Sequence, residues 1–297
     1  MANVGTTVAL LPNVRGFLFA ILIFAVALFQ AKAAASASTE FPFEFHDGFL
    51  WVKVSVPQSG TPLNFLLDSG ASVSVINLET AQRLKLHLGQ PVSVQGVESS
   101  TKGFWSHRLI VKADGVQLQK NYLAVDLEKL GQACNCCVDG LIGADFFRDK
   151  VVQIDFDAQK IRILKSNNAE KSDEALPLEL RSCGMRVPIT VDGHKQQWVR
   201  LDTGCASALQ WVTSDVSIEQ CTRKTAIGLN AISIPQTQTT VNVGEQAFEK
   251  VPTGLHETAI FPGEAGLLGN DLLSRFSTVT IDTKAGRVIL QKHSSRE

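Results

Sequence analysis

The sequence predicts a mainly β protein made of two similar lobes with few short helices. Several stretches alternate apolar and polar residues, as half-buried strands do, among them residues 50–56 and 185–191. Turn-forming pairs such as Asp192-Gly193 separate these stretches. The order of motifs in the first half of the chain also recurs in the second half. This repeat predicts two lobes of one architecture, each built mostly from hairpins.

The repeat is clearest around two aspartates. Residues 65–72 read FLLDSGAS, and residues 199–207 read VRLDTGCAS. Each motif follows the second strand of a predicted hairpin. Each is followed further along by an apolar-apolar-glycine element, LIG at 141–143 and LLG at 267–269, and then by a strand-like run. One Asp-Ser/Thr-Gly tripeptide is a weak signal, but this ordered set, present twice, is far more specific.

The helical signal is modest. Residues 78–88 space apolar side chains near the helical period, and short helical turns are expected after Gly143 and Gly269. Asp145 and Asp271, which recur at equivalent places, are expected to cap these short helices. The rest of each lobe is predicted to be strand and turn.

Four segments are predicted along the chain. Residues 1–37 form an export signal, and residues 38–165 form the first lobe. Residues 166–180 are a polar linker, and residues 181–297 form the second lobe. Each lobe is long enough to bury a core of its own.

The first segment has the three parts of a secretory signal. Arg15 precedes an unbroken apolar run at residues 17–29, and small residues with alanine-x-alanine spacing follow. The run is shorter than the ~20 residues of a membrane span, and Lys32 interrupts its extension. We therefore expect cleavage after Ala35 or Ala37 and a periplasmic or extracellular protein. An uncleaved membrane anchor is the alternative.

Composition and motifs disfavour several classes of protein. Hydrophobic residues make up 44% of the chain and charged residues 19%, which is typical of a globular protein and not of a disordered or collagen-like one. The formal net charge is -1 and there is no run of Lys and Arg, so nothing favours a nucleic acid partner. Gly-x-Ser-x-Gly and His-Glu-x-x-His motifs are absent.

Six cysteines are compatible with up to three disulfides in an exported chain, and sequence alone does not choose among the 15 pairings. A metal site is the alternative for the cluster at residues 134–137. No CxxC partner or nearby histidine completes a four-ligand set there. We therefore expect no metal and no cofactor.

Taken together, the motifs resemble those of aspartic proteases of the pepsin/retropepsin superfamily, in a two-repeat single-chain form. The resemblance rests on Asp68-Ser69-Gly70-Ala71, Asp202-Thr203-Gly204-Cys205, Leu141-Ile142-Gly143 and Leu267-Leu268-Gly269. It spans about residues 49–165 and 184–291, nearly all of the predicted mature chain. It implies the acid-protease fold of two β-barrel-like lobes, aspartic endopeptidase activity, a peptide or protein substrate, and a monomer with an internal pseudo-twofold.

The chemistry of such a pair follows from electrostatics. A pseudo-twofold brings Asp68 and Asp202 together between the lobes, and two adjacent carboxylates do not both ionise readily. The pair therefore holds one proton over a wide pH range, and its titration belongs to both groups. The ionised member acts as general base toward water, and the protonated member donates to the scissile carbonyl. The alternative is that both aspartates cap turns, a common role of Asp before Ser-Gly.

Four neighbours are expected to support the pair. Gly70 and Gly204 allow the special dihedral angles and close backbone approach that a paired site needs. By resemblance, the hydroxyls of Ser69 and Thr203 hydrogen-bond across the interface between the lobes. The Leu-Ile-Gly and Leu-Leu-Gly elements, again by resemblance, pack beneath the aspartate loops.

Substrate is expected to lie between the lobes as an extended strand beneath a closing hairpin. The first-lobe hairpin is predicted at residues 95–105, and the second-lobe hairpin near residues 226–230. The candidates for substrate binding within them are three glycines and a tryptophan: Gly96, Gly103, Trp105 and Gly228. Ordinary surface hairpins are the alternative for both, and core filling is the alternative for the tryptophan.

Three features depart from the family pattern. Cys205 replaces the usual alanine and is open to a disulfide, with Cys221 as a candidate partner. No tyrosine stands in the first predicted hairpin, which favours a retropepsin-like arrangement. Only a short stretch separates the predicted signal from the first strand, so no long inhibitory segment is expected.

Two alternatives to a monomeric enzyme remain open. The first is a non-catalytic exported protein that binds peptides or proteins on the same two-lobed scaffold, because fold does not fix function. The second is a homodimer that uses one aspartate per chain, which the two copies of the motif disfavour. The presence of both aspartates and both following hydroxyls favours the enzyme.

Overall fold

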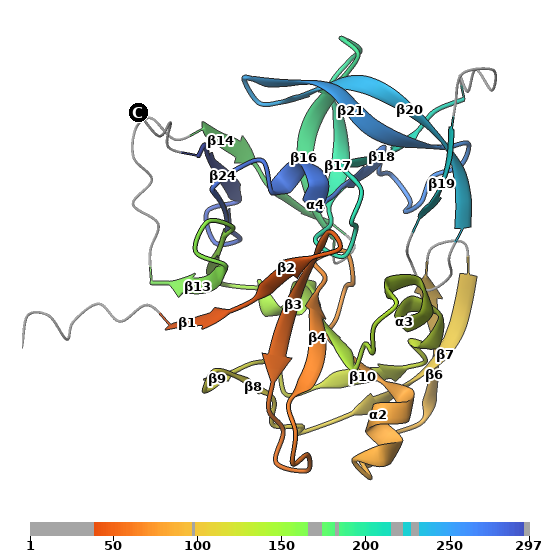
Figure 1. The fold of residues 1–297 in the computed structure, drawn as a ribbon, viewed down its shortest axis with the longest axis vertical. Coiled ribbons are helices and arrows are strands. Elements are labelled where there is room, and N and C mark those ends of the chain that lie inside the picture. The colour runs from red at the N-terminus through yellow and green to blue at the C-terminus, as the bar shows by residue number, and fades with distance from the viewer. Residues whose placement is uncertain are drawn as a thin grey trace, which may run out of the picture. The chain divides into compact units, whose positions relative to one another are not determined.

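The structure is a computed structural model (Figure 1). It describes residues 39–96, 99–165, 174–181, 184–214, 222–226 and 232–293. The predicted signal with its whole cleavage region lies outside these residues. So do Cys183, Cys221 and Gly228. Within the described part of the chain, no helix has both the length and the apolar character that a membrane crossing requires.

The first lobe is a sheet of eight strands that carries the first aspartate motif (Figure 1). In the order in which they neighbour one another, its strands are β2 (Glu44–His46), β3 (Phe49–Val54), β4 (Leu63–Leu67), β11 (Gly140–Ile142), β5 (Val75–Asn77), β10 (Tyr122–Val125), β7 (Ser99–Ser106) and β6 (Pro91–Gly96). β4 runs parallel to β11, and β5 runs parallel to β10. A small hairpin of β8 (Lys112–Ala113) and β9 (Val116–Gln117) joins it through a bridge to Ser55.

The second lobe repeats this strand order. Its strands are β15 (Glu179–Arg181), β16 (Gly184–Val191), β17 (Gln197–Leu201), β22 (Gly266–Leu268), β18 (Leu209–Val212), β21 (Gln246–His256), β20 (Ile232–Val243) and β19 (Thr222–Ala226). The parallel pairs β17–β22 and β18–β21 occupy the same places as their counterparts in the first lobe. The prediction of a mainly β fold with two similar lobes and few short helices is confirmed.

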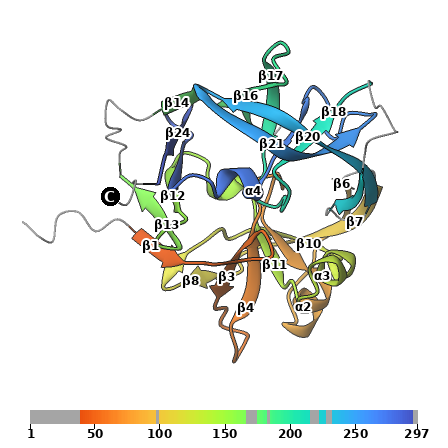
Figure 2. The same ribbon diagram turned by 45° about the horizontal axis from the view of Figure 1, so that its top comes forward.

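A third sheet of six strands joins the two halves of the chain (Figure 2). Its order is β1 (Thr39–Pro42), β13 (Lys160–Leu164), β12 (Val151–Asp155), β23 (Thr278–Asp282), β24 (Arg287–Gln291) and β14 (Glu174–Pro177). The central pair, β12 and β23, brings together one strand from each half. β14 lies within the segment predicted as a linker, where Leu176 is buried and the backbone pairs with β24.

The helices are short, as predicted, but their details differ. The described helices are α2 (Leu78–Arg83), α3 (Glu128–Cys134), the 3-10 helix η2 (Ala144–Phe146) and α4 (Asn270–Leu273). The helix predicted at 78–88 ends early because the chain turns at Lys85, which has a φ of +54°. The short helices after Gly143 and Gly269 are present.

The expected helix caps are wrong. Asp145 does not cap η2, because its carboxylate instead accepts a hydrogen bond from the Ser74 hydroxyl over 2.7 Å. Asp271 lies in the first turn of α4 and pairs with Arg275 at 3.3 Å. Both helices begin at a glycine with no side-chain cap.

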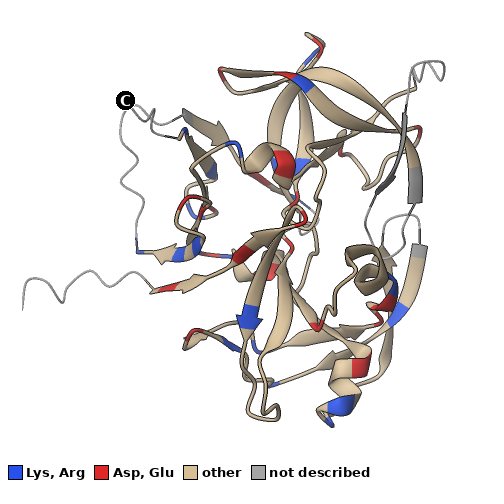
Figure 3. Ribbon diagram, in the orientation of Figure 1, with Lys and Arg blue, Asp and Glu red and all other residues tan. Residues whose placement is uncertain are grey.

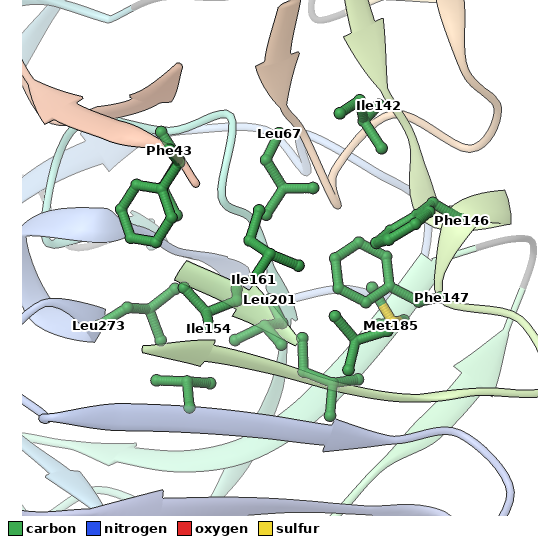
Figure 4. Close-up of a cluster of buried hydrophobic side chains, with 14 of the residues drawn as sticks. Phe43, Leu67, Ile142, Phe146, Phe147, Ile154, Ile161, Met185, Leu201 and Leu273 are labelled. Atoms are coloured by element: carbon green, nitrogen blue, oxygen red, sulfur yellow. The ribbon is translucent and has the colours of Figure 1, made fainter. Parts of the chain in front are cut away.

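The largest core cluster draws on both lobes and on the six-stranded sheet (Figure 4). Leu67 and Leu201, which directly precede the two aspartates, are each at most 1% exposed within it. Phe146, Phe147 and Ile154 pack into the same cluster. Burying each such side chain contributes roughly 1.5–3 kcal/mol to the free energy of unfolding. The strands that end at the aspartates are therefore anchored in a well-packed core.

Charged side chains are mixed in sign over both lobes. Figure 3 shows Lys and Arg interspersed with Asp and Glu among the described residues.

Candidate active site

The two aspartate loops meet through reciprocal hydrogen bonds. The backbone N–H of Ser69 donates to Thr203 Oγ1 over 2.9 Å, and the backbone N–H of Thr203 donates to Ser69 Oγ over 3.0 Å. The Ser69 hydroxyl donates to the carbonyl of Leu201, and the Thr203 hydroxyl donates to the carbonyl of Leu67. Each buried hydroxyl therefore accepts from and donates to the opposite loop, which fixes the two loops against each other.

This arrangement brings the carboxyl groups of Asp68 and Asp202 together, because each lies against the glycine of the opposite loop and each shifts the pKa of the other. Asp68 Oδ1 accepts from the backbone N–H groups of Gly70 and Ala71, each over 3.0 Å. Asp202 Oδ1 accepts from the backbone N–H of Gly204 over 2.9 Å. Asp202 is 8% exposed. The two acids thus share one site, and the backbone donors around them are unequal.

Gly70 and Gly204 have no room for a side chain. A Cβ on Gly70 would lie 2.4 Å from Asp202 Oδ1, and a Cβ on Gly204 would lie 2.3 Å from Asp68 Oδ1. Both glycines are therefore needed for the close approach of each loop to the opposite carboxyl, whereas neither has the positive φ that special dihedral angles would imply.

The surroundings raise the pKa of both aspartates. Burial, followed by the negative charge of Asp68, raises the pKa of Asp202 from 3.8 to about 7. Burial also raises the pKa of Asp68, but the N–H groups of Ala71 and Gly70, the guanidinium of Arg200 and the hydrogen bond from Asp202 all oppose this rise. The proton that the pair retains therefore sits on Asp202.

The raised pKa of Asp202 predicts a stability that falls as the pH rises. The folded protein holds a proton on Asp202 up to about pH 7, whereas an unfolded aspartate loses it near 3.8. The folded state thus binds more protons between these values, and the free energy of unfolding should fall across them by a few kcal/mol at most. Asp202→Asn removes this dependence, so its melting temperature should exceed that of the wild type at pH 7.

Thermal unfolding of both proteins between about pH 4 and pH 7 measures this effect. The difference in melting temperature should shrink toward the acidic end of the range, where Asp202 is protonated in both states. A difference that stays constant with pH would show that Asp202 titrates normally.

A cavity of about 510 Å³ lies beside the pair, a size typical of ligand pockets. Apolar side chains of the first lobe form most of its wall, including Val92, Val94 and Leu123. Asp202, Gly204, Phe261 and Leu267 are the contributions of the second lobe among the residues described. The cavity can therefore take an apolar side chain next to the two carboxyl groups.

The first predicted hairpin is formed by β6 and β7, and it borders this cavity. Gly96 and Trp105 line the cavity, and Trp105 is half-buried, packs against a core cluster of the first lobe and stacks its ring on His107. Gly103 has a different role, because a Cβ there would lie 2.6 Å from Val94 and would separate the two strands. In the second lobe β19 and β20 form a hairpin, but residues 227–231, with Gly228, lie outside the described residues.

Sequence reasoning missed Arg200, which is 3% exposed. Its guanidinium binds the Glu264 carboxylate through two hydrogen bonds of 2.7 and 2.8 Å and donates to the carbonyl of Gly70 over 2.9 Å. The ring of Phe261 lies 3.7 Å from it. The available signal was an arginine in VRLD at the place where the first repeat has leucine in FLLD.

Cys205 is a free thiol in the structure, and its candidate disulfide partner, Cys221, lies outside the described residues. The thiol is 6% exposed, and burial together with the charge of Asp202 raises its pKa to about 12, which leaves it unreactive. Its sulfur hydrogen-bonds to the Ser207 hydroxyl over 3.6 Å. The other described cysteines, at 134, 136 and 137, are also free thiols.

The described residues hold no group of three His, Cys, Asp or Glu side chains that could bind a metal ion. The chemistry of the two carboxyl groups requires none, because a carboxylate and a carboxylic acid supply both general base and general acid.

Residues 52–146 match the family model for aspartyl proteases. The search of curated proteins found no match. Among solved structures, the chain is similar to the aspartic proteinase from Irpex lacteus, with 14% sequence identity and a TM-score of 0.58. The match covers 87% of this chain and 98% of that one. At this identity the likeness establishes the fold and not the specificity.

Two lobes of one strand order, joined by a six-stranded sheet, with a pair of aspartate loops at their interface, define the acid-protease fold. The family match covers most of the first lobe, and the structural match covers both lobes. The predicted resemblance to the aspartic proteases of the pepsin/retropepsin superfamily is therefore confirmed.

Proposed function

We propose that the protein is an aspartic endopeptidase that hydrolyses peptide bonds in the cleft between its lobes. The observation that supports this most strongly is the pair of carboxyl groups, Asp68 and Asp202, which meet beside an apolar cavity, each against the glycine of the opposite loop. Perturbed pKa values in a cleft are typical of catalytic groups, and burial raises the pKa of Asp202 to about 7.

The unequal surroundings assign the two roles. Asp68 receives two backbone N–H donors and is the ionised member, so it takes a proton from a bound water that attacks the scissile carbonyl carbon. Asp202 is the protonated member and gives its proton to the carbonyl oxygen. As the C–N bond of the tetrahedral intermediate breaks, Asp68 gives the proton it took from water to the leaving nitrogen, and one hydroxyl of the intermediate returns a proton to Asp202. No covalent bond to the enzyme forms at any step.

The substrate is an extended peptide with an apolar side chain next to the scissile bond. The cavity wall formed by Val92, Val94 and Leu123 supports this, because it offers apolar surface beside the carboxyl pair. The first segment of the chain, with its signal-like pattern, supports export as the route by which the protein meets such substrates. The protein acts as a monomer, because one chain supplies both aspartates.

A peptide-cleavage assay tests the proposal. The purified protein is incubated with casein and with a peptide library from about pH 3 to pH 8, with and without a pepstatin-type inhibitor. We expect inhibitor-sensitive cleavage with a bell-shaped pH dependence, preferentially next to apolar residues. A folded protein that cleaves no peptide but binds one by calorimetry would favour the alternative of a binding protein on the same scaffold.

A further inference from the structure

At one buried position next to the aspartates, an apolar side chain in the first repeat is replaced by a charged one in the second. Leu66 in β4 and Arg200 in β17 stand two residues before Asp68 and Asp202. Leu66 is an ordinary apolar core residue, whereas Arg200 places a guanidinium where only 3% of the residue is exposed. A buried charge costs several kcal/mol unless it is well paired, so its contacts need an explanation.

Two of these contacts neutralise the charge. Glu264, whose side chain is also 3% exposed, accepts from Nε and Nη2 of Arg200 in a two-pronged ion pair. The ring of Phe261 covers the guanidinium and also lines the cavity. Gly184 leaves the space for this group, because a Cβ there would lie 2.7 Å from Arg200 Nη2.

The third contact crosses to the first lobe. Nη1 of Arg200 donates to the carbonyl oxygen of Gly70 over 2.9 Å. The same peptide group carries the N–H of Ala71, which donates to Asp68 Oδ1 over 3.0 Å. Guanidinium, peptide and carboxylate thus form one chain of hydrogen bonds, in which each bond polarises and strengthens the next.

We propose that Arg200 is a positioning residue of the aspartate pair. It holds the Gly70–Ala71 peptide with its N–H directed at Asp68, and it thereby keeps Asp68 as the member that is ionised and accepts the proton of water. This inference rests on the proposed function for its catalytic meaning, but the preference for ionising Asp68 can be measured without catalysis.

The charged groups around the guanidinium set the sign of the effect. Glu264 faces it from the loop before β22, and Asp68 and Asp202 face it from the two aspartate loops. Arg200 lowers the pKa of both aspartates, so its removal should move both titrations to higher pH. Cys205 stays neutral because burial raises its pKa to about 12.

The chain offers a matched control on the neighbouring strand. Arg186 in β16 is the register partner of Arg200 in β17 and is 2% exposed. It pairs with Glu179 at 2.5 Å and donates to the carbonyl of Gly263 over 2.8 Å. It therefore contacts the same loop as Arg200, at the residue next to Glu264, but its hydrogen-bond partners lie in the second lobe and not in the first aspartate loop.

The test uses double variants, because removing one partner alone would leave a buried charge unpaired. Arg200→Met with Glu264→Met is compared with Arg186→Met with Glu179→Met. A second version, Arg200→Gln with Glu264→Gln, keeps polar side chains of similar size in case the methionine pair does not fold. The measurements are the pH profile of kcat for peptide cleavage and the carboxyl carbon titrations of Asp68 and Asp202 by NMR.

We expect both Arg200 variants to move the acidic limb of the kcat profile and both carboxyl titrations to higher pH, with the larger shift at Asp68, whose N–H donor Arg200 positions. A shift of about one pH unit corresponds to an about tenfold loss of kcat below that limb. The Arg186 variant should leave the titrations and the profile unchanged. Folded Arg200 variants with wild-type titrations would overturn the inference and leave Arg200 a purely structural role.

The outcome is separable from that of the proposed function. If the wild type cleaves no peptide, the function fails, yet the carboxyl titrations still report whether Arg200 controls which aspartate ionises. If cleavage occurs and the titrations do not move, the function stands and the role of Arg200 fails. Loss of folding in both Arg200 variants, with a folded Arg186 control, would likewise contradict a positioning role and assign Arg200 to stability.

Discussion

Asp68→Asn and Asp202→Asn are each expected to lower kcat/KM for peptide cleavage by about 10³-fold, within the range that general acid–base catalysis contributes. Asparagine has nearly the shape of aspartate but neither ionises nor carries an acidic proton. In the proposed mechanism, Asp68→Asn removes the base that takes the proton of water, and Asp202→Asn removes the acid that protonates the carbonyl oxygen. Because the pair acts as a unit, the double variant should be little worse than either single variant.

Asp271→Asn is the matched control for these variants. Asp271 also recurs in both repeats, but it lies in the first turn of α4 and pairs with Arg275. Its replacement should leave kcat/KM within twofold of the wild type. Circular dichroism and thermal unfolding check that all variants fold. Substantial cleavage by a folded Asp68→Asn or Asp202→Asn protein would refute the paired mechanism.

Gly143→Ala is expected to destabilise the protein by ~3 kcal/mol or more and to reduce cleavage activity. Gly143 ends the first Leu-Ile-Gly element, and its backbone N–H donates to the Ser74 hydroxyl over 3.1 Å. A Cβ there would lie 2.3 Å from the carbonyl carbon of Val73, in the loop that follows the first aspartate motif. The neighbouring atoms are backbone, so relief requires movement of that loop and of Asp68 with it.

Urea unfolding measures the loss of stability, and Gly60→Ala provides the control. Nothing lies within 4 Å of a Cβ on Gly60, and that glycine does not have a left-handed φ. The control should therefore unfold within about 0.5 kcal/mol of the wild type. Equal stability of Gly143→Ala and Gly60→Ala would mean that the aspartate loop is not packed against Gly143.

The aspartate pair and its glycines could be predicted because their signals are local and occur twice. Each motif contains, in consecutive positions, an acid at the end of an apolar strand, a hydroxyl residue and a glycine. These residue types by themselves indicate an acidic group held in a tight loop. The two mainly β lobes followed from the same order of motifs in each half. Local sequence patterns do not indicate which residue, distant in the sequence, each side chain contacts in the folded protein.

Arg200 illustrates what the sequence could not reveal. Its partners, Glu264 and Gly70, come from a distant loop and from the other lobe, so no spacing rule connects them. Helix α3 was missed for a related reason. Its sequence includes Gly131 and it has no side-chain cap, so its intrinsic helical preference is weak, and the burial of Leu130 holds it in place.

Asp145 shows competition between two roles. An aspartate near the start of a helix is a reasonable cap. In this structure, however, the Ser74 hydroxyl donates a hydrogen bond to the Asp145 carboxylate instead. The second repeat has Asn270 and Asp271 at the corresponding helix, and there the amide of Asn270 donates to the carbonyls of Gly48 and Thr203. Equivalent positions thus have diverged in partners while the strands around them have kept their order.

The wall of the cavity comes chiefly from the first lobe, although the two acids occupy equivalent places. A peptide has a direction, from its amino end to its carboxyl end. A cleft with two identical sides would bind a peptide in either direction. Unequal sides remove that ambiguity. For the proposed endopeptidase, we therefore expect every bound peptide to lie in the cleft with the same polarity and to present its scissile bond to Asp68 and Asp202 in the same sense.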